Sequence, residues 1–201
     1  MSIMEQNRDT VIRYEHELFA KAKAENKPEE CLNLGCGERI LEGFTNIDKY
    51  YVNPNVKNYD MYQLPYVDNA INLIFSAQSL EHLPIRYAKM ALRDWYRVLK
   101  PNGTLVLMVP DLNTIMIKLL DEEYLSEDNY NWYMYTLFGY QINSGIRDTG
   151  LNHPVDHGQF HTCGFSRFKL TNELTSIGYK INKMFSFDGL DTPSIFVEAI
   201  K

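Results

Sequence analysis

Two glycines stand in the segment LNLGCG at residues 32–37, at the end of an apolar run of strand length. Glycine lets the backbone turn sharply and lets a ligand approach to contact distance, where a side chain would block it. A glycine turn directly after a strand is typical of nucleotide sites, but many strand ends carry glycine and bind nothing. The segment therefore predicts either a ligand-binding turn or a purely structural one.

Polar side chains follow three further runs of strand length. Asp48 closes the second run, Asp60 follows the third just before Met61, and residues 76–78, Ser-Ala-Gln, end the fourth. An acidic residue after the second strand accepts hydrogen bonds from ribose hydroxyls in nucleotide-binding α/β folds, although a helix cap or a solvated turn residue is the alternative. Because open parallel sheets bind ligands outside the carboxyl ends of their strands, these groups predict one nucleotide site.

The sequence disfavours two common kinds of nucleotide. The dinucleotide fingerprint G-x-G-x-x-G requires a third glycine at the position of Ile40, so a nicotinamide-dependent oxidoreductase is only a disfavoured alternative. The phosphate-binding pattern G-x-x-x-x-G-K-[ST] does not occur, so a cradle for ATP or GTP is missing as well.

Two titratable residues are candidates for proton transfer. His82 comes a few residues after the fourth run, and a histidine titrates near neutral pH, so it is suited to take a proton from a substrate. A helix-start histidine that packs locally is the alternative. Asp111 follows the fifth run and is either a second candidate or the N-cap of the next helix.

Histidines and aromatic residues gather between residues 121 and 164. The segment 143–164 contains four groups that can bind metal, namely His153, His157, His161 and Cys163. Their spacing matches no standard zinc module, so we expect no metal site and a role for His157 and His161 in binding substrate or capping structure. The acidic, aromatic segment 121–140, with Trp132 and Tyr133, predicts either an aromatic lid that attracts a cationic group or a helix with its rings on the core.

Alternating strand and helix patterns must position these groups. The runs of strand length are 31–34, 45–48, 56–59, 71–75 and 104–109. Apolar residues at helical spacing run from Ala88 to Leu99, up to a stop at Pro101-Asn102-Gly103, which implies a right-handed parallel crossover. Only residues 38–44 separate the glycine turn from the second run, so we expect at most a turn or two of helix there.

The remaining elements flank this half of the chain. We expect an amphipathic helix within residues 1–27, a helix from 112 to about 120, a helix from 165 that stops at Gly178, and strands over 179–187 and 194–200 that return as a hairpin.

Composition limits the class of protein. The 201 residues predict a single domain, and Lys and Arg number 20 against 26 Asp and Glu, a net charge of −6 that disfavours nucleic acid as a partner. The 3 cysteines form no C-x-x-C pair, which argues against a disulfide framework and favours a reduced, cytoplasmic setting. No apolar run is long enough for a membrane span.

Taken together, these motifs resemble the class I S-adenosylmethionine-dependent methyltransferases, and within them the type 11 group. The matching stretches are LNLGCG at 32–37 with Asn46-Ile47-Asp48, Tyr59-Asp60 with Leu64-Pro65, the strand 68–75, SLEHL at 79–83, RVLKPNG at 97–103 and VPDL at 109–112, and more loosely 161–165 ahead of Ile177-Gly178-Tyr179.

The resemblance implies an α/β fold, a Rossmann-like three-layer sandwich whose mostly parallel seven-stranded sheet has an antiparallel last strand. S-adenosylmethionine would be the cofactor and S-adenosylhomocysteine the product. Residues 31–112 would hold the cofactor, with 121–164 as an insertion and loop and 165–201 closing the sheet. The implied cofactor residues are Leu34, Gly35, Cys36, Gly37, Asp48, Asp60, Met61, Ala77 and Gln78.

The expected activity is methyl transfer to an unidentified acceptor, a small molecule or sugar-containing metabolite. His82 and Asp111 are then the catalytic candidates, and Trp132, Tyr133, His157 and His161 the substrate candidates. A module that holds the cofactor without transferring methyl is the main alternative.

Overall fold

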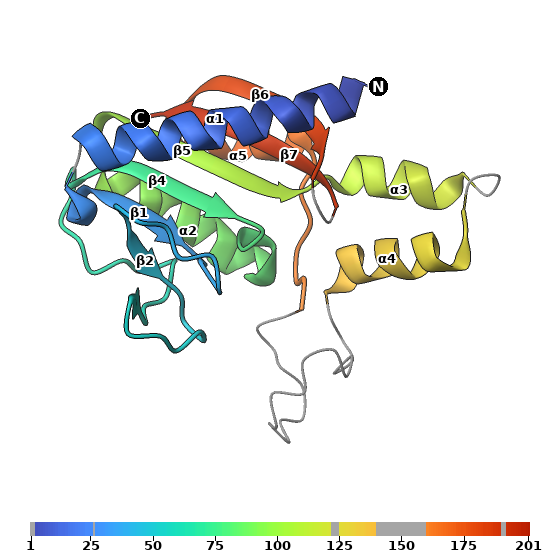
Figure 1. The fold of residues 1–201 in the computed structure, drawn as a ribbon, viewed down its shortest axis with the longest axis horizontal. Coiled ribbons are helices and arrows are strands. Elements are labelled where there is room, and N and C mark those ends of the chain that lie inside the picture. The colour runs from blue at the N-terminus through green and yellow to red at the C-terminus, as the bar shows by residue number, and fades with distance from the viewer. Residues whose placement is uncertain (1–2, 26, 122–124, 140–159, 190–191) are drawn as a thin grey trace.

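The computed structural model describes residues 3–25, 27–121, 125–139, 160–189 and 192–201. Its strands form one sheet in the order β3-β2-β1-β4-β5-β7-β6 (Figure 1). Their bounds are β1 Cys31–Leu34, β2 Thr45–Ile47, β3 Val56–Lys57, β4 Ile71–Ala77, β5 Leu99–Pro110, β6 Lys180–Asp188 and β7 Pro193–Ile200. The neighbours from β3 to β5 pair in parallel, and β7 runs antiparallel to both β5 and β6. The predicted mostly parallel sheet with an antiparallel last strand is confirmed.

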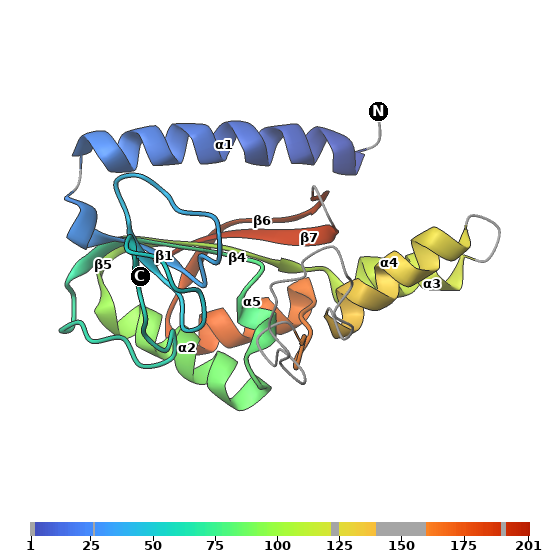
Figure 2. The same ribbon diagram turned by 60° about the horizontal axis from the view of Figure 1, so that its bottom comes forward.

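Helices cover both faces of this sheet. They are α1 Ile3–Glu25, α2 Ile85–Val98, α3 Leu112–Leu120, α4 Glu127–Phe138 and α5 Arg167–Ile177, with short 3-10 helices η1 Pro28–Glu30 and η2 Leu80–His82. Figure 2 shows α1 alone along one face and α2 with α5 along the other, which are the three predicted layers. The pair α3 and α4 lies beyond the carboxyl ends of β4 and β5 (Figure 1).

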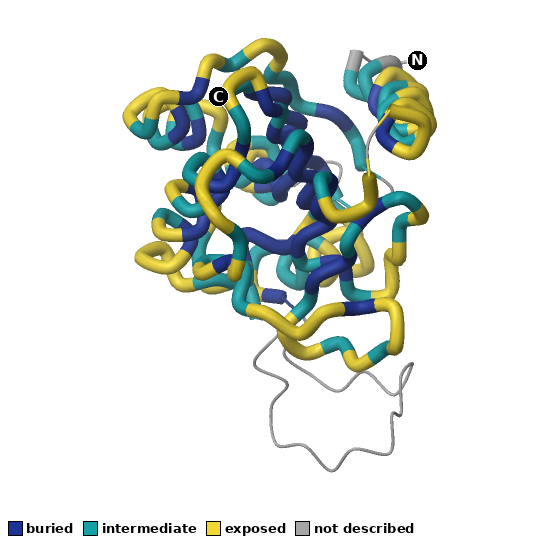
Figure 3. Tube along the Cα trace, turned by 90° about the vertical axis from the view of Figure 1, so that its left-hand side faces the viewer, coloured by how far each residue is buried: buried dark blue, intermediate teal, exposed yellow. Residues whose placement is uncertain are grey.

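The core follows the predicted periodicities. The buried residues of α2 recur every three or four positions, as Ala88, Ala91, Leu92, Trp95 and Val98, because that spacing keeps them on one face of a helix. In β5 the residues from Leu105 to Pro110 are all buried, as expected of a strand covered on both faces. The buried residues in Figure 3 accordingly run through the middle of the molecule along the strands.

The helix α1 packs along one face of the sheet (Figure 2). Val11 and Ala22 are buried, and the ring of Phe19 meets the ring of Phe75 on β4 edge-on, with centroids 5.0 Å apart. It ends before Pro28, as predicted. No helix in the described part of the chain is long and apolar enough to cross a membrane.

The connection from β1 to β2 contains turns and no helix. Its length allows at most a turn or two of helix. The buried side chains of Asn33 and Asn46 supply the bonds that a helix would have made internally. Asn46 accepts from the N–H of Leu41 at 2.9 Å and donates to the carbonyls of Leu41 and Phe44, while Asn33 donates to Asn46 Oδ1 at 2.8 Å. These bonds satisfy a loop whose backbone would otherwise lack partners.

Several predicted boundaries are shifted. The helix predicted to continue through Leu99 ends at Val98, because Leu99 already pairs with Ile71 as the first residue of β5. The turn at Pro101-Asn102-Gly103 therefore lies inside β5, where Asn102 has a φ of 66° and the register with β4 shifts. The third strand is also shorter than predicted and consists of Val56 and Lys57.

Candidate functional site

The predicted glycine turn leaves β1 at the carboxyl edge of the sheet, beside the end of β4. Gly35 and Gly37 have φ values of +64° and +47°, in the left-handed region that favours glycine. A Cβ on Gly35 would lie 2.3 Å from Ser79 Cβ and 2.9 Å from Met61 Cε, whereas a Cβ on Gly37 would meet nothing within 4 Å. Gly35 therefore permits close packing within the protein, and Gly37 leaves open space beside the turn.

Asp48 faces this turn from the end of β2. Its Oδ2 accepts the N–H of Gly37 at 2.9 Å, and its Oδ1 accepts the N–H groups of Tyr50 and Tyr51 at 2.8 and 2.9 Å. Three backbone donors thus fix the carboxylate. An ionised carboxylate has about four acceptor positions, so Oδ2 keeps room for a hydroxyl of a ligand.

The other residues predicted to border the cofactor have these contacts, and Met61 lies against the turn at Gly35. Asp60 forms an ion pair with Lys49 at 2.7 Å, and the carbonyl of Met61 accepts the indole N–H of Trp95 at 2.7 Å. Leu34 and Cys36 are buried. Burial raises the pKa of Cys36 to about 12, with the Asp48 carboxylate adding to the shift, so this thiol stays protonated and unreactive near neutral pH.

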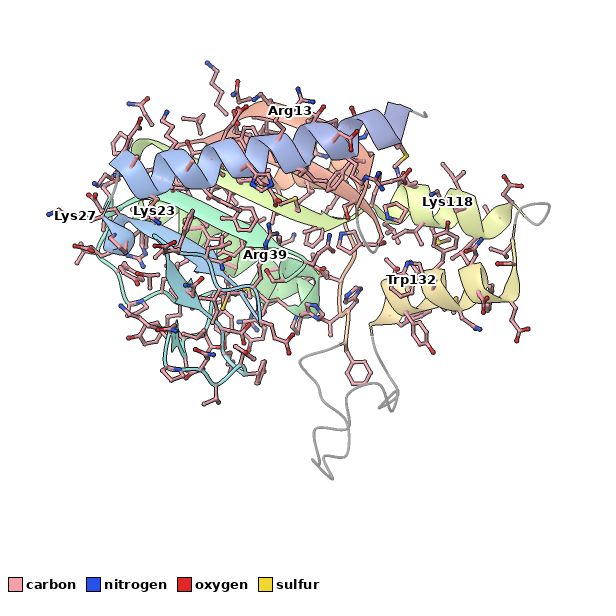
Figure 4. The ribbon with its side chains drawn as sticks, viewed as in Figure 1. Arg13, Lys23, Lys27, Arg39, Lys118 and Trp132 are labelled. Atoms are coloured by element: carbon pink, nitrogen blue, oxygen red, sulfur yellow. The ribbon has the colours of Figure 1, made fainter. Side chains whose placement is uncertain are left out.

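A cavity of about 320 Å³ lies between the end of β4 and the helices α1 and α4, and its lining includes neither the glycine turn nor Asp48. Ala77 and Gln78 line it from β4, Trp132 from α4, and Arg39 from the loop after β1. Figure 4 shows Trp132 and Arg39 coming from different elements toward this region. Arg39 is held by Glu15 of α1 at 2.9 Å, so the loop after β1 and the N-terminal helix form one wall.

Gln78 has a backbone conformation that signals constraint. Its φ is 51° although it is not glycine, which costs about 1–2 kcal/mol. Its N–H donates to the carbonyl of Met108 at 2.9 Å, and its side-chain Nε2 donates to Ser194 Oγ at 2.8 Å. Such strain persists where the surrounding structure fixes a residue, and it clusters at ligand sites.

Three titratable side chains lie close together in the wall of the cavity, namely Glu81, His82 and His161. Glu81 is 1% exposed, and burial raises its pKa to about 8. Burial lowers the pKa of His82 to about 4, with the neighbouring His161 adding to the depression, and burial also lowers the pKa of His161. Near neutral pH all three groups therefore stand mostly uncharged.

Asp111, the second predicted catalytic residue, lies outside this cluster. Its Oδ1 accepts the N–H groups of Asn113 and Thr114, and its Oδ2 accepts the hydroxyls of Thr114 and Ser186 at 2.8 and 2.6 Å. These bonds make Asp111 the N-cap of α3, which was the alternative interpretation.

The predicted substrate residues are divided among three locations. Trp132 and His161 line the cavity. Tyr133 lies instead beneath Lys118 of α3, whose Nζ is 5.8 Å from the ring centroid. His157, like His153, falls outside the described residues. Thr136 is the only buried residue of α4, so the aromatic rings of that helix do not pack in the core.

Sequence reasoning missed Glu81 as a member of the site. It was visible only as part of the SLEHL stretch, and nothing in the sequence shows that its carboxyl group is buried. The contribution of α1 to the cavity was also missed, because an amphipathic pattern predicts a buried face and not what that face borders.

One protein-family model matches part of the chain. Residues 44–107 match the family model for the type 11 methyltransferase domain. The predicted resemblance to the type 11 methyltransferases is confirmed. The matched region runs from the loop before β2 into β5 and so includes Asp48, Asp60, Gln78 and the Glu81-His82 pair.

Solved structures share the fold over most of the chain. An S-adenosylmethionine-dependent methyltransferase from Methanosarcina mazei is 17% identical with a TM-score of 0.61, covering 88% of this chain and 93% of that one. A Pyrococcus horikoshii protein is 15% identical with a TM-score of 0.59, covering 100% and 93%. An S-adenosylmethionine-dependent methyltransferase from Mesorhizobium loti is 14% identical with a TM-score of 0.54, covering 93% and 97%. No curated protein sequence matches this chain.

Proposed function

We propose that this protein transfers a methyl group from S-adenosylmethionine to a small-molecule acceptor. The observation that carries the proposal is the pairing of the Gly37 N–H with Asp48 beside open space, at the carboxyl edge of β1 and β2. This is the edge at which open α/β sheets bind nucleotides. The family match over residues 44–107 favours S-adenosylmethionine over other nucleotides.

In this proposal the cofactor lies along the glycine turn and enters the cavity at Gln78. Asp48 would accept hydrogen bonds from the ribose hydroxyls, and Asp60 with Met61 would border the adenine. The sulfonium end would then point toward Ala77 and Gln78, whose backbone forms part of the cavity wall. Leu34, Gly35 and Cys36 would act by holding the turn.

The acceptor would occupy the rest of the cavity, with Trp132, His82 and His161 around it. Methyl transfer is an in-line displacement at a sulfonium, so holding the acceptor atom a few ångströms from the methyl group supplies much of the acceleration. The aromatic ring of Trp132 suits a place beside the sulfonium or a cationic acceptor, because aromatic faces attract cations. A volume of about 320 Å³ suits a small molecule.

Calorimetric titration tests the cofactor assignment. We expect micromolar binding of S-adenosylmethionine and S-adenosylhomocysteine, and no binding of NADH. In Asp48→Asn one acceptor oxygen can still face Tyr50 and Tyr51, but the amide N–H₂ would oppose the Gly37 N–H. We therefore expect the affinity for S-adenosylhomocysteine to fall at least about tenfold, because the variant loses about one hydrogen bond between the ligand and a charged group.

The matched control is Asp68→Asn, which changes an exposed aspartate near the amino-terminal end of β4. Circular dichroism would establish that both variants fold. Normal ligand binding by folded Asp48→Asn would refute the role of Asp48, and failure of the folded wild type to bind either sulfur ligand would refute the proposal. Binding without methyl transfer across a broad acceptor panel would favour a non-catalytic module.

A further inference from the structure

The cluster of Glu81, His82 and His161 has the composition of a metal site. One carboxylate oxygen of Glu81 and one ring nitrogen of each histidine lie within 4.8 Å of one another. Glu81 and His82 belong to η2, directly after β4, whereas His161 precedes α5. All three residues line the cavity that we assign to the acceptor.

Both histidines are oriented by their Nδ1 atoms. His82 Nδ1 lies 3.1 Å from the carbonyl oxygen of Phe160, and His161 Nδ1 lies 2.6 Å from that of Thr136. A carbonyl oxygen only accepts hydrogen bonds, so each Nδ1 must carry the proton. In the neutral rings the lone pair is then on Nε2. Metal-binding histidines show this arrangement, in which the second ring nitrogen donates to a carbonyl or carboxylate.

The carboxyl group of Glu81 is an independent indication of a ligand. It is 1% exposed, and neither of its oxygens makes a well-formed hydrogen bond within the described residues, although the backbone N–H groups of Ser79 and Glu81 lie close enough to offset part of the burial that raises its pKa. Buried polar groups are almost always paired, because an unpaired one has lost its water and gained nothing. A bound cation would supply the missing interaction.

The backbone fixes the two segments that carry these groups. The N–H groups of Thr162 and Cys163 donate to the carbonyl of Glu81 at 2.9 and 3.2 Å, and Thr162 Oγ1 donates to the carbonyl of His82 at 3.0 Å. His161 is therefore tied to η2 on its C-terminal side. The ligand set is held together before any ion arrives, which lowers the entropy lost on binding.

We propose that Glu81, His82 and His161 bind one divalent transition-metal ion, with zinc the best match. Two imidazoles with one carboxylate suit Zn²⁺ and neighbouring first-row ions, whereas Mg²⁺ and Ca²⁺ prefer all-oxygen sites. Tetrahedral zinc bonds of about 2.1 Å place ligand atoms about 3.4 Å apart, so small side-chain rotations would close the cluster around the ion. Three protein ligands leave a coordination position open.

This metal site would determine which functional group of the acceptor is methylated. That inference rests on the proposed methyl transfer. A hydroxyl oxygen bound at the open position would lose its proton to water more readily, because the ion stabilises the resulting oxyanion. That oxygen would then bond to the methyl carbon as the carbon–sulfur bond breaks, and the electron pair of that bond would remain on sulfur. The acceptor class is therefore a small molecule with a hydroxyl that can bind a metal.

Metal titration of tag-free, chelator-treated protein tests the site directly. We expect about one equivalent of Co²⁺ to give the visible absorption of a four- or five-coordinate site, and Zn²⁺ to displace it. The variants Glu81→Gln and His161→Asn should weaken Co²⁺ binding at least about tenfold, since each removes one of three ligands. His16→Asn, which changes an exposed histidine on α1, is the matched control and should bind as wild type.

Failure of the folded wild type to bind Co²⁺ or Zn²⁺, or unchanged binding in both ligand variants, would overturn the inference. Circular dichroism on each sample identifies a variant that has not folded, and the second variant then decides. Calorimetry with S-adenosylhomocysteine on the same metal-free protein separates the two proposals. Binding of S-adenosylhomocysteine without any metal binding would support the proposed function and refute the metal site. Binding of metal without any binding of S-adenosylhomocysteine would support the metal site and refute the proposed function.

Discussion

Adding one methyl group at either glycine of the turn should separate stability from cofactor binding. Gly35 and Gly37 both have left-handed backbones, so alanine is strained at both positions. Only at Gly35 does the new Cβ also meet protein atoms, at 2.3 Å from Ser79 Cβ and 2.9 Å from Met61 Cε. Gly35→Ala and Gly37→Ala are therefore a matched pair with the same change two residues apart.

The expected sizes follow from these contacts. The left-handed conformation costs an alanine about 1–2 kcal/mol, which applies to both variants. Overpacking adds about 1–3 kcal/mol at Gly35 alone, because the Ser79 Cβ is fixed close to its backbone and cannot swing away. We expect the free energy of unfolding to fall by about 2–5 kcal/mol in Gly35→Ala and by about 1–2 kcal/mol in Gly37→Ala.

Ligand binding should respond differently. The Cβ of Gly37→Ala would project into the open space that we assign to the cofactor, so we expect at least about a tenfold loss of affinity for S-adenosylhomocysteine in a well-folded protein. Urea denaturation measures the first effect and isothermal titration calorimetry the second. Equal stability of the two variants would refute the packing argument, and unchanged affinity in Gly37→Ala would mean that the cofactor does not pass over Gly37.

Two further predictions concern residues that support the fold. Arg97 donates to two carboxylates and two backbone carbonyls. Arg97→Lys should therefore lower the free energy of unfolding, measured by urea denaturation, by about 1–3 kcal/mol. A loss of S-adenosylhomocysteine affinity in the folded variant would show that the role of Arg97 is not purely structural. Glu173 accepts from Lys169 and also faces Lys89, which lowers its pKa in the folded state. This stabilisation is present above the unfolded pKa of Glu173 and disappears as the pH falls through its folded pKa. Glu173→Gln should therefore lower the free energy of unfolding by up to about 1 kcal/mol at pH 7. An equal loss at pH 3 would contradict an ionic origin.

The strands, and the parallel crossover between the fourth and the fifth of them, could be predicted because local patterns determine them. The apolar run Leu105–Val109 lies in the fully buried part of β5, and helical spacing from Ala88 to Val98 gives α2. The connection after β1 could not be predicted in detail. Its conformation depends on bonds from Asn33 and Asn46, and no pattern in the sequence indicates which loop atoms these amides reach.

The candidate site was predictable only on its cofactor side. Asp48 and the glycine turn meet because both follow strands that are neighbours in the sheet, and strand order follows from the crossover pattern. The acceptor side depends on tertiary contacts. His161 reaches His82 across 4.7 Å between ring centroids although the two are far apart in the chain, and the burial of Glu81 has no local signature.

The division of the chain suggests how acceptor choice could vary within one fold. The family match begins at residue 44 and ends at residue 107, whereas α1 precedes that region and both α4 and His161 follow it. These flanking parts supply Val11, Trp132 and His161 to the cavity, while Gln78 and His82 come from the matched region. Glu15 of α1 pairs with Arg39 of the loop after β1, so only changes in α1 that spare this pair leave the β1–β2 edge intact. Substitutions of Val11 in α1 or Trp132 in α4 should therefore change which acceptor is methylated, while calorimetry with S-adenosylhomocysteine should show unchanged affinity.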